Sequence, residues 1–154
     1  MFGFSPLGHY GRMAAGALSL VDRTATRVFY VEVADQVDEI RRAWPRLEAA
    51  VGSLRGRHFL GVFDPIQGWY RACVKAEPDK GLAELPLPDM TIPGGRFARI
   101  RLRGQPPDVY LEIGPTYERL MSAMQRDDTR PSLESYRRLD EIDLLMPVID
   151  PART

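Results

Sequence analysis

The sequence predicts an α+β protein made of two copies of one unit, each a strand, a helix and a β-hairpin in that order. Runs of β-branched and aromatic residues alternate with segments whose apolar residues recur every three or four positions. The order of these elements repeats after about 70 residues, which is too long a period for a solenoid and indicates an internal duplication. The chain of 154 residues is 44% hydrophobic and 27% charged, as in an ordinary globular domain.

The first copy begins with the strand RVFYVEV, residues 27–33. Asp35 is the expected N-cap of the helix that follows. The apolar stripe of this helix is predicted from residues at helical spacing: Val37, Ile40, Trp44, Leu47, Val51 and Leu54. Trp44 is assigned to core packing, and Pro45 is expected to kink or restart the helix.

A β-hairpin and a proline-rich joint complete the first copy. Residues 57–76 contain two strand-like runs around the turn sequence DPIQG. Residues 77–95 are too rich in proline for a helix and are expected to join the two copies, with one short edge strand at 90–92.

The second copy repeats this order. Residues 96–104 predict a strand, and residues 106–124 predict a helix with Pro115 in its middle. The closing hairpin spans residues 130–148. We expect both copies to share one antiparallel sheet with the two helices on one face, which leaves the other face to form a small-molecule groove.

Composition and charge exclude several classes of function. Lysine plus arginine equals aspartate plus glutamate at 21 each, so no overall basic field favours direct DNA binding. Cys73 is the single cysteine, which excludes an internal disulfide and favours a reducing compartment. His9 and His58 lack metal-ligand spacing, so neither a metal nor a cofactor is expected. No apolar run is long enough for a membrane span and no secretory signal is recognisable, so a soluble cytoplasmic protein is expected.

Four segments stand in a characteristic order: IRRAWPRL at 40–47, FLGVFDPIQGWYRACV at 59–74, IPGGRFARIRLRG at 92–104 and the closing hairpin at 130–148. In this order they resemble the gyrase-inhibitor-like (GyrI-like) small-molecule-binding domains, which also form the effector-binding halves of bacterial multidrug-responsive regulators. The resemblance implies two strand-helix-strand-strand (SHS2-type) modules related by a pseudo-twofold axis, with a ligand groove. It assigns residues 27–154 to the binding domain and leaves 1–26 as an extension of unknown role, too short for a helix-turn-helix domain.

The same resemblance implies a ligand-binding glutamate beside aromatic rings, and Glu134 in the closing hairpin is the matching position. Period-two alternation places Trp69, Arg71 and Cys73 on one face of their strand, and we assign this face to the groove. Further candidate ligand-binding residues are aromatic: Tyr136, Phe97, Tyr30, Phe63 and Tyr110.

Two other constellations favour structural explanations. His58 and Cys73 lie on the two arms of one hairpin, but no oxyanion site accompanies them, so a Cys/His nucleophile is disfavoured. Four arginines lie on the strand at 96–104 and suit phosphates, although charges that protect an edge strand from pairing explain them better: Arg96, Arg99, Arg101 and Arg103.

The leading functional prediction is a standalone binding protein for lipophilic, often cationic, aromatic molecules, acting in drug sequestration or sensing. The resemblance also implies an alternative, because some standalone members of the family look like hydrolases that open cyclopropane-bearing genotoxins; Glu134 and Trp69 in the same groove would then be the catalytic residues. A gyrase inhibitor protein is a second alternative, suggested by the family name alone. The oligomeric state stays open, with a homodimer as one option.

Overall fold

Within the described part of the chain, eight strands form one antiparallel sheet in the order β1-β6-β8-β7-β3-β4-β2-β5. The structure is a computed structural model, and it describes residues 16–149. The strands are β1 (Ser19–Arg23), β2 (Thr26–Ala34), β3 (Phe59–Asp64), β4 (Trp69–Lys75), β5 (Asp89–Ile92), β6 (Gly95–Arg103), β7 (Ser132–Arg138) and β8 (Glu141–Pro147). The helices are α2 (Val37–Val51) and α3 (Ile113–Ala123), with short 3-10 helices at Pro78–Lys80 and Asp108–Glu112.

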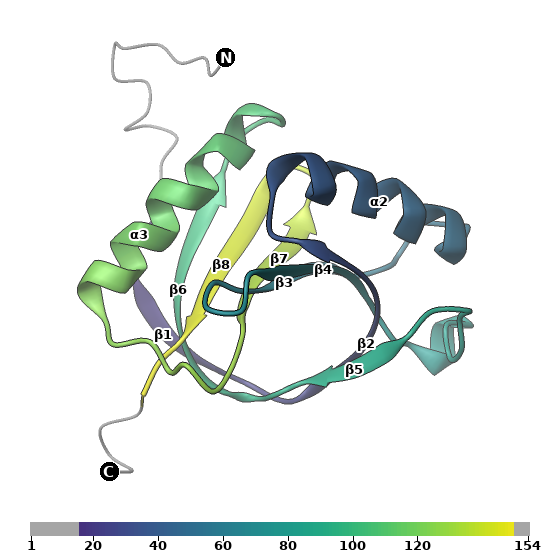
Figure 1. Ribbon diagram of the computed structural model, residues 1–154, viewed down its shortest axis with the longest axis horizontal. Coiled ribbons are helices and arrows are strands. Elements are labelled where there is room, and N and C mark those ends of the chain that lie inside the picture. Colours follow the sequence, from purple (N-terminus) through teal and green to yellow (C-terminus); the bar gives the residue numbers. More distant parts are fainter. Residues whose placement is uncertain (1–15, 150–154) are drawn as a thin grey trace.

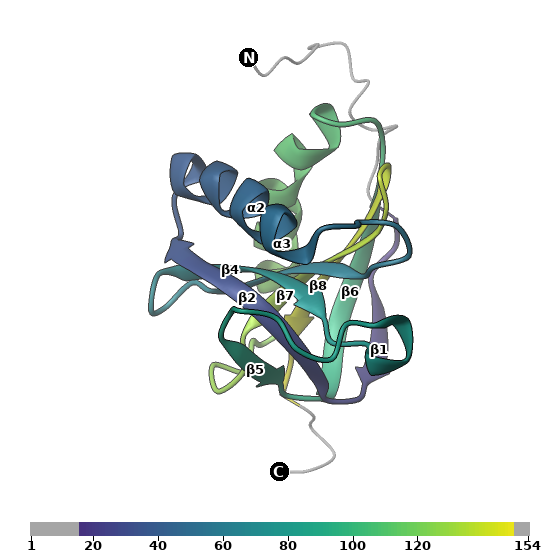
Figure 2. The ribbon, with the colours of Figure 1, turned by 90° about the vertical axis from the view of Figure 1, so that its right-hand side faces the viewer.

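The predicted duplication is confirmed by this order. The unit β2-α2-β3-β4 is followed by β6-α3-β7-β8, and β3 pairs with β7 at the centre of the sheet. Outward from this pair the strands run β3, β4, β2 on one side and β7, β8, β6 on the other. Both helices lie on the same face of the sheet, as expected (Figures 1 and 2).

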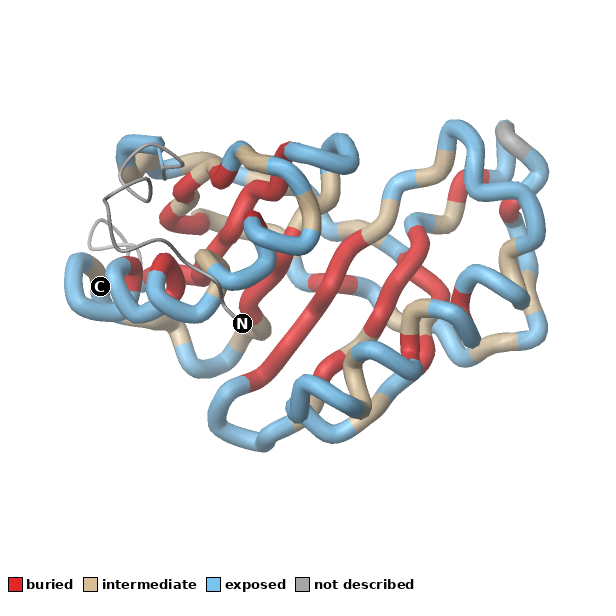
Figure 3. The backbone as a smooth tube through the Cα atoms, turned by 90° about the horizontal axis from the view of Figure 1, so that it is seen from above, coloured by how far each residue is buried: buried red, intermediate tan, exposed pale blue. Residues whose placement is uncertain are grey.

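The core between helices and sheet follows the alternation along each strand. Leu47 from α2 and Leu120 from α3 are fully buried against Phe29, Ile100 and Met146. Figure 3 shows buried backbone along the central strands and exposed backbone in the turns and on the outer sides of the helices.

Two short links force the sheet to curl. β1 continues into β2 through two residues, and β5 continues into β6 through two more, although each link joins strands six positions apart in the sheet. In a flat sheet that separation is about 29 Å, whereas such a link reaches only about 10 Å. The links touch, because a Cβ on Gly94 would lie 2.6 Å from the carbonyl oxygen of Arg23. The sheet is therefore curled into a half-barrel (Figure 1).

The curl corrects the expectation of a groove on the face opposite the helices. This inner face is lined by a second apolar cluster in which Val28, Val62, Cys73 and Leu133 have no exposed surface. The strands at both ends bend over the centre and bury it, so the middle of the inner face is packed core.

Several boundary predictions also need correction. Gln36, and not Asp35, is the N-cap of α2, and the helix runs without a restart through Pro45. Residues 108–112 form a 3-10 helix, so Pro115 lies in the first turn of α3, where its missing N–H group is tolerated. β6 is not an edge strand, because β1 pairs with its outer side. The edge strand at β5 is confirmed, whereas β1 was not predicted.

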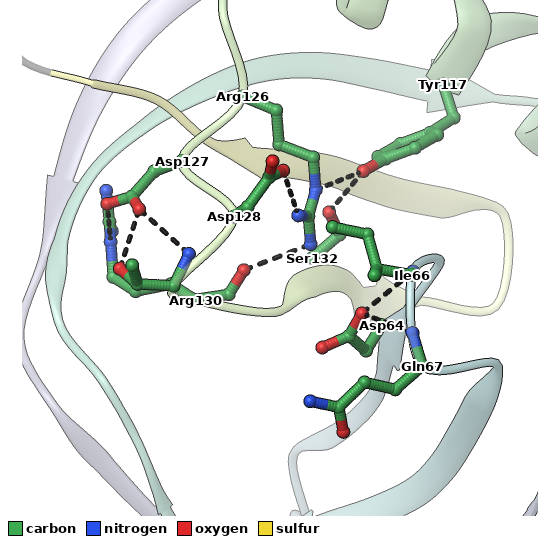
Figure 4. A network of polar contacts seen from close by, with 10 residues as sticks. Asp64, Ile66, Gln67, Tyr117, Arg126, Asp127, Asp128, Arg130 and Ser132 are labelled. Carbon is green, nitrogen blue, oxygen red and sulfur yellow. Dashed lines mark hydrogen bonds and ion pairs between the residues drawn. The ribbon is translucent and has the colours of Figure 1, made fainter.

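Arg126 ties the loop after α3 to the sheet (Figure 4). Its side chain is 7% exposed, and its Nε donates to the Tyr117 hydroxyl at 2.9 Å while Nη2 donates to the carbonyl oxygen of Arg130 at 3.0 Å. The Tyr117 hydroxyl also bonds the Ser132 hydroxyl at 2.6 Å, at the start of β7.

We expect Arg126→Ala to lower the free energy of unfolding by about 2–3 kcal/mol, because buried acceptors would lose charged donors. Arg119→Ala, an exposed change on α3, is the control and should alter it by less than about 0.5 kcal/mol. Urea denaturation followed by circular dichroism measures both. Equal effects of the two substitutions would show that the Arg126 network does not hold this loop.

Candidate functional site

Glu134 lies at the centre of the pseudo-twofold arrangement, on the helix face of the sheet. In β7 it pairs with Gly61 of β3, the two strands where the copies meet. Alternation along β7 places Ser132, Glu134 and Tyr136 on one face, and Ser132 contacts Tyr117 of α3. Glu134 is 7% exposed, which is unusual for a carboxylate.

Two phenols donate hydrogen bonds to one oxygen of this carboxylate. The Tyr136 hydroxyl donates to Oε1 at 2.6 Å, and the Tyr70 hydroxyl donates to the same atom at 2.9 Å. Within residues 16–149 no donor reaches the second oxygen, Oε2. One oxygen is therefore fixed by two phenols, and the other accepts no hydrogen bond from residues 16–149.

The absence of a side chain at Gly61 makes this geometry possible. A Cβ built there would lie 2.6 Å from Oε1 of Glu134 and 2.8 Å from Cζ of Tyr70. Real Cβ contacts are never so close, so the carboxylate and the phenol occupy the space above Gly61.

Aromatic rings surround the carboxylate and its phenols. Trp44 of α2 packs edge-on against Tyr136, with ring centroids 5.4 Å apart, and against Tyr70 at 6.4 Å. Phe63 stacks on Tyr70 at 6.5 Å and meets Tyr117 of α3 edge-on at 5.1 Å. This aromatic row, defined as Trp44, Tyr136, Tyr70, Phe63 and Tyr117, runs from α2 to α3.

Burial raises the pKa of Glu134 above its usual value, since desolvation outweighs the hydrogen bonds from Tyr136 and Tyr70. A nearby carboxylate, Asp35, acts in the same direction. Burial and the Glu134 charge also raise the pKa of Tyr70 and Tyr136 well above the usual value, so both phenols remain hydrogen-bond donors at neutral pH.

Glu134 has no basic partner in the part of the chain that the structure describes. Of the other buried carboxylates, Asp64 accepts the backbone N–H groups of Ile66 and Gln67, and three have a basic side chain as partner. Asp143 binds Arg101 at 2.6 Å, Glu141 binds Arg103 at 3.0 Å, and Glu77 binds His58 at 2.9 Å. A buried carboxylate surrounded by neutral phenols and rings is an unbalanced arrangement that a bound cation would complete.

The candidate residues from the sequence divide between the two faces. Glu134, Tyr136 and Phe63 lie together on the helix face, and Tyr110, 43% exposed, is within electrostatic reach of Tyr136. The other candidates lie on the inner face: Trp69, Arg71, Phe97 and Tyr30. The expectation that Trp69 and Glu134 share one groove is therefore wrong.

The inner-face candidates form contacts of their own. The Arg71 guanidinium lies 4.3 Å from the ring centroids of both Tyr30 and Trp69, and its Nε donates to Glu32 at 2.8 Å. Arg130 lies 5.0 Å from the ring centroid of Phe97, which is buried. These rings already hold a protein cation, so they are structural contacts.

Sequence reasoning missed Trp44, Tyr70 and Gly61 as parts of this site. Trp44 falls on the apolar stripe of its helix, and this position predicts core packing. Alternation places Tyr70 on the face of its strand opposite to the one that we assign to the groove. The phenol of Tyr70 is the feature of the sequence that could have indicated its place in the site. A buried tyrosine hydroxyl needs a hydrogen-bond partner, and Glu134 is a suitable acceptor.

The disfavoured Cys/His pair is not formed. His58 Nδ1 contacts Glu77 Oε1, and Cys73 is buried with its Sγ directed to the carbonyl oxygen of Arg71. Burial raises the pKa of the Cys73 thiol well above its usual value, which makes it a poor nucleophile. Among residues 16–149 there is no cluster of three metal-ligating side chains. In the same range no helix has the length and apolar character needed to cross a membrane.

No protein-family model matches this sequence, and no curated protein matches it. Its fold is shared with solved structures. An integron cassette protein from the mobile metagenome of Vibrio cholerae superimposes with a TM-score of 0.68 at 12% identity, over 88% of this chain and 99% of the other. The chain adopts a fold already known in bacteria.

Two more solved structures share the fold. SAV2435 bound to tetraphenylphosphonium gives a TM-score of 0.63 at 13% identity, over 89% of this chain and 96% of that one. A proposed bacterial transcription regulation protein from Staphylococcus aureus MU50 gives 0.58 at 12% identity, over 88% and 99%. At these identities the likeness establishes the fold alone.

We expect Gly61→Ala to destabilise the protein by about 1–3 kcal/mol, because the new methyl group overlaps Glu134 and Tyr70. Gly114→Ala is the matched control. Gly114 lies in α3, and a Cβ added to it would meet nothing within 4 Å. It should be neutral or stabilising by up to about 1 kcal/mol. Thermal and urea unfolding measure both. A neutral Gly61→Ala would mean that the carboxylate does not occupy this space.

We expect Glu134→Gln to stabilise the ligand-free protein at pH 8 by an amount in the ordinary single-site range, about 0.5–3 kcal/mol. The amide oxygen still accepts both phenols, and the cost of burying a charge is removed. The pKa of Glu134 is higher in the folded protein than in the unfolded chain. The contribution of Glu134 to the free energy of unfolding is therefore most favourable below its pKa in the unfolded chain, and it is lost as pH rises through its pKa in the folded protein. The stability difference between the two proteins should therefore grow from pH 4 to pH 8. A difference independent of pH would contradict the raised pKa.

Proposed function

We propose that the protein binds lipophilic aromatic cations on the helix face of its sheet, with Glu134 as the anionic group that selects for positive charge. The observation that carries this proposal is the buried carboxylate with two neutral phenol donors and no basic partner among the described residues. The cost of burying that charge is recovered when a cation binds.

The aromatic row supports the same class of ligand. Trp44, Tyr70 and Tyr136 present ring faces and edges around the carboxylate, and a delocalised cation gains from both the charge and the ring quadrupoles. Two surface hollows within residues 16–149, of about 240 and 310 Å³, do not include Glu134 among their lining residues. We infer that a ligand enters between the helices by displacing the half-buried Trp44 ring, which packs against both phenols.

Two independent indications agree with this class. The sequence resembles GyrI-like domains in four ordered segments, with Glu134 at the matching position. The fold is shared with SAV2435, which was solved with tetraphenylphosphonium, an aromatic cation. We infer a role in sequestering or sensing such compounds.

Two single-tryptophan variants test which face binds the ligand, because Trp44 and Trp69 are the only tryptophans. In Trp69→Phe the remaining reporter is Trp44, and its fluorescence should change with saturation on addition of tetraphenylphosphonium. In Trp44→Phe the remaining Trp69 lies on the inner face and should not respond. A response from Trp69 alone would place the ligand on the inner face and overturn the proposal.

Charge selectivity is tested by Glu134→Gln. Affinity for tetraphenylphosphonium should fall by about 1–3 kcal/mol, whereas affinity for the neutral triphenylphosphine oxide should hardly change. Glu32→Gln is the matched control, because it removes a carboxylate paired with Arg71 on the inner face. Isothermal titration calorimetry measures all six combinations of protein and ligand, wild type included. Equal losses of affinity for both ligands in Glu134→Gln would show that Glu134 does not select for positive charge.

A further inference from the structure

A cluster of arginines lies on the inner face of the curled sheet, on the opposite side from Glu134. Arg99, Arg101 and Arg103 occupy alternate positions of β6, in phase with Phe97, whose ring belongs to the inner apolar cluster. Arg137 of β7 reaches the same carboxylates as Arg101, and Arg23 of β1 is in electrostatic range of one of them. We call these residues the arginine rim: Arg23, Arg99, Arg101, Arg103 and Arg137.

Two buried carboxylates of β8 satisfy part of this charge. Arg101 binds Asp143 through Nε at 2.6 Å and Nη2 at 3.1 Å, a two-point contact with both carboxylate oxygens. Glu141 accepts from Arg103 at 3.0 Å, and Arg137 is more distant from both carboxylates, at 3.9 and 4.0 Å. Five arginines and two carboxylates leave three positive charges without a counter-charge.

Arg137 carries one of these three charges, and Arg99 and Arg23 carry the other two. Arg99 is half-buried, and neither it nor Arg23 has a hydrogen bond or an ion pair within residues 16–149. Burial lowers the pKa of Arg23 below its usual value, and Asp143 only partly offsets this effect. Arg23 is thus a desolvated positive charge that Asp143 compensates only in part.

A hollow of about 240 Å³ opens at this position, lined by Gly16, Ala17, Arg99, Arg101 and Arg103. Gly16 lies beside the hollow, because its backbone N–H donates to the carbonyl oxygen of Arg101 at 2.8 Å. This bond extends the pairing of β1 with β6 beyond the start of β1. The hollow thus combines a free guanidinium, two guanidinia already paired with carboxylates, and room for a small molecule.

We propose that this hollow binds a small oxyanion with two or more negative charges, such as a pyrophosphate or a tricarboxylate group. The planar guanidinium favours two-point contacts with phosphate and carboxylate oxygens, and Arg101 already makes this contact with Asp143. An oxyanion beside Arg99 would supply the missing counter-charge. The edge-protection explanation for these arginines fails, because β6 lies between β1 and β8.

The proposal is tested by calorimetric titration of the whole protein with pyrophosphate at low ionic strength. We expect saturable binding with one site per chain, and affinity that falls as salt is added. Arg99→Gln should weaken it by about tenfold or more, since one charge-assisted contact is lost. This substitution breaks no hydrogen bond or ion pair of the described residues, so the fold should be retained, which thermal unfolding verifies.

Arg119→Gln is the matched control, because it removes the same charge from an exposed position on α3. Its effect on pyrophosphate affinity should be less than about twofold. Equal losses of affinity in the two variants would show that pyrophosphate binding depends on the overall charge of the protein and would overturn the proposal. The absence of saturable binding at millimolar pyrophosphate would also overturn it. Binding of a DNA duplex that pyrophosphate does not displace would do so as well, since the rim would then be a nucleic-acid surface.

Discussion

The architecture depends on one geometric constraint, the shortness of the two links that join opposite sides of the sheet. Because β1 enters β2 and β5 enters β6 through two residues each, strands that would be far apart in a flat sheet must come close together. The resulting curl buries the middle of the inner face with apolar side chains. The helix face carries Glu134 and the aromatic row, to which both copies contribute.

The two faces carry opposite electrostatic imbalances, although the whole chain has zero formal net charge. On the helix face Glu134 is buried with phenols as its partners, at the point where the two copies meet. On the inner face the arginine rim exceeds the carboxylates available to it. The overall net charge does not reveal these imbalances, because they cancel in the sum. Their separation in space is the basis on which we propose a cation site on one face and an anion site on the other.

The elements were largely predictable, because hydrophobic periodicity and turn residues act locally. The two hairpins, the edge strand at β5 and the order of both copies follow from such signals. β1 was not predicted, since a five-residue strand at Ser19–Arg23 is defined by pairing with β6, about 76 residues away in sequence. The 3-10 helix before α3 was also missed, because it changes the hydrogen-bond pattern and leaves the apolar spacing unchanged.

Periodicity and turn residues are sufficient to predict the α+β class and the duplication, and the family resemblance singles out Glu134 among the carboxylates. Alternation also predicts which residues of each strand share a face, because side chains alternate whatever the strand packs against. Which of those faces meets the helices depends on long-range packing, and this packing puts Tyr70 beside Glu134 and Trp69 on the opposite side. Alternation gives two sets of residues in each strand but does not say which set is buried under the helices, because that depends on the curl of the sheet and on the positions of α2 and α3.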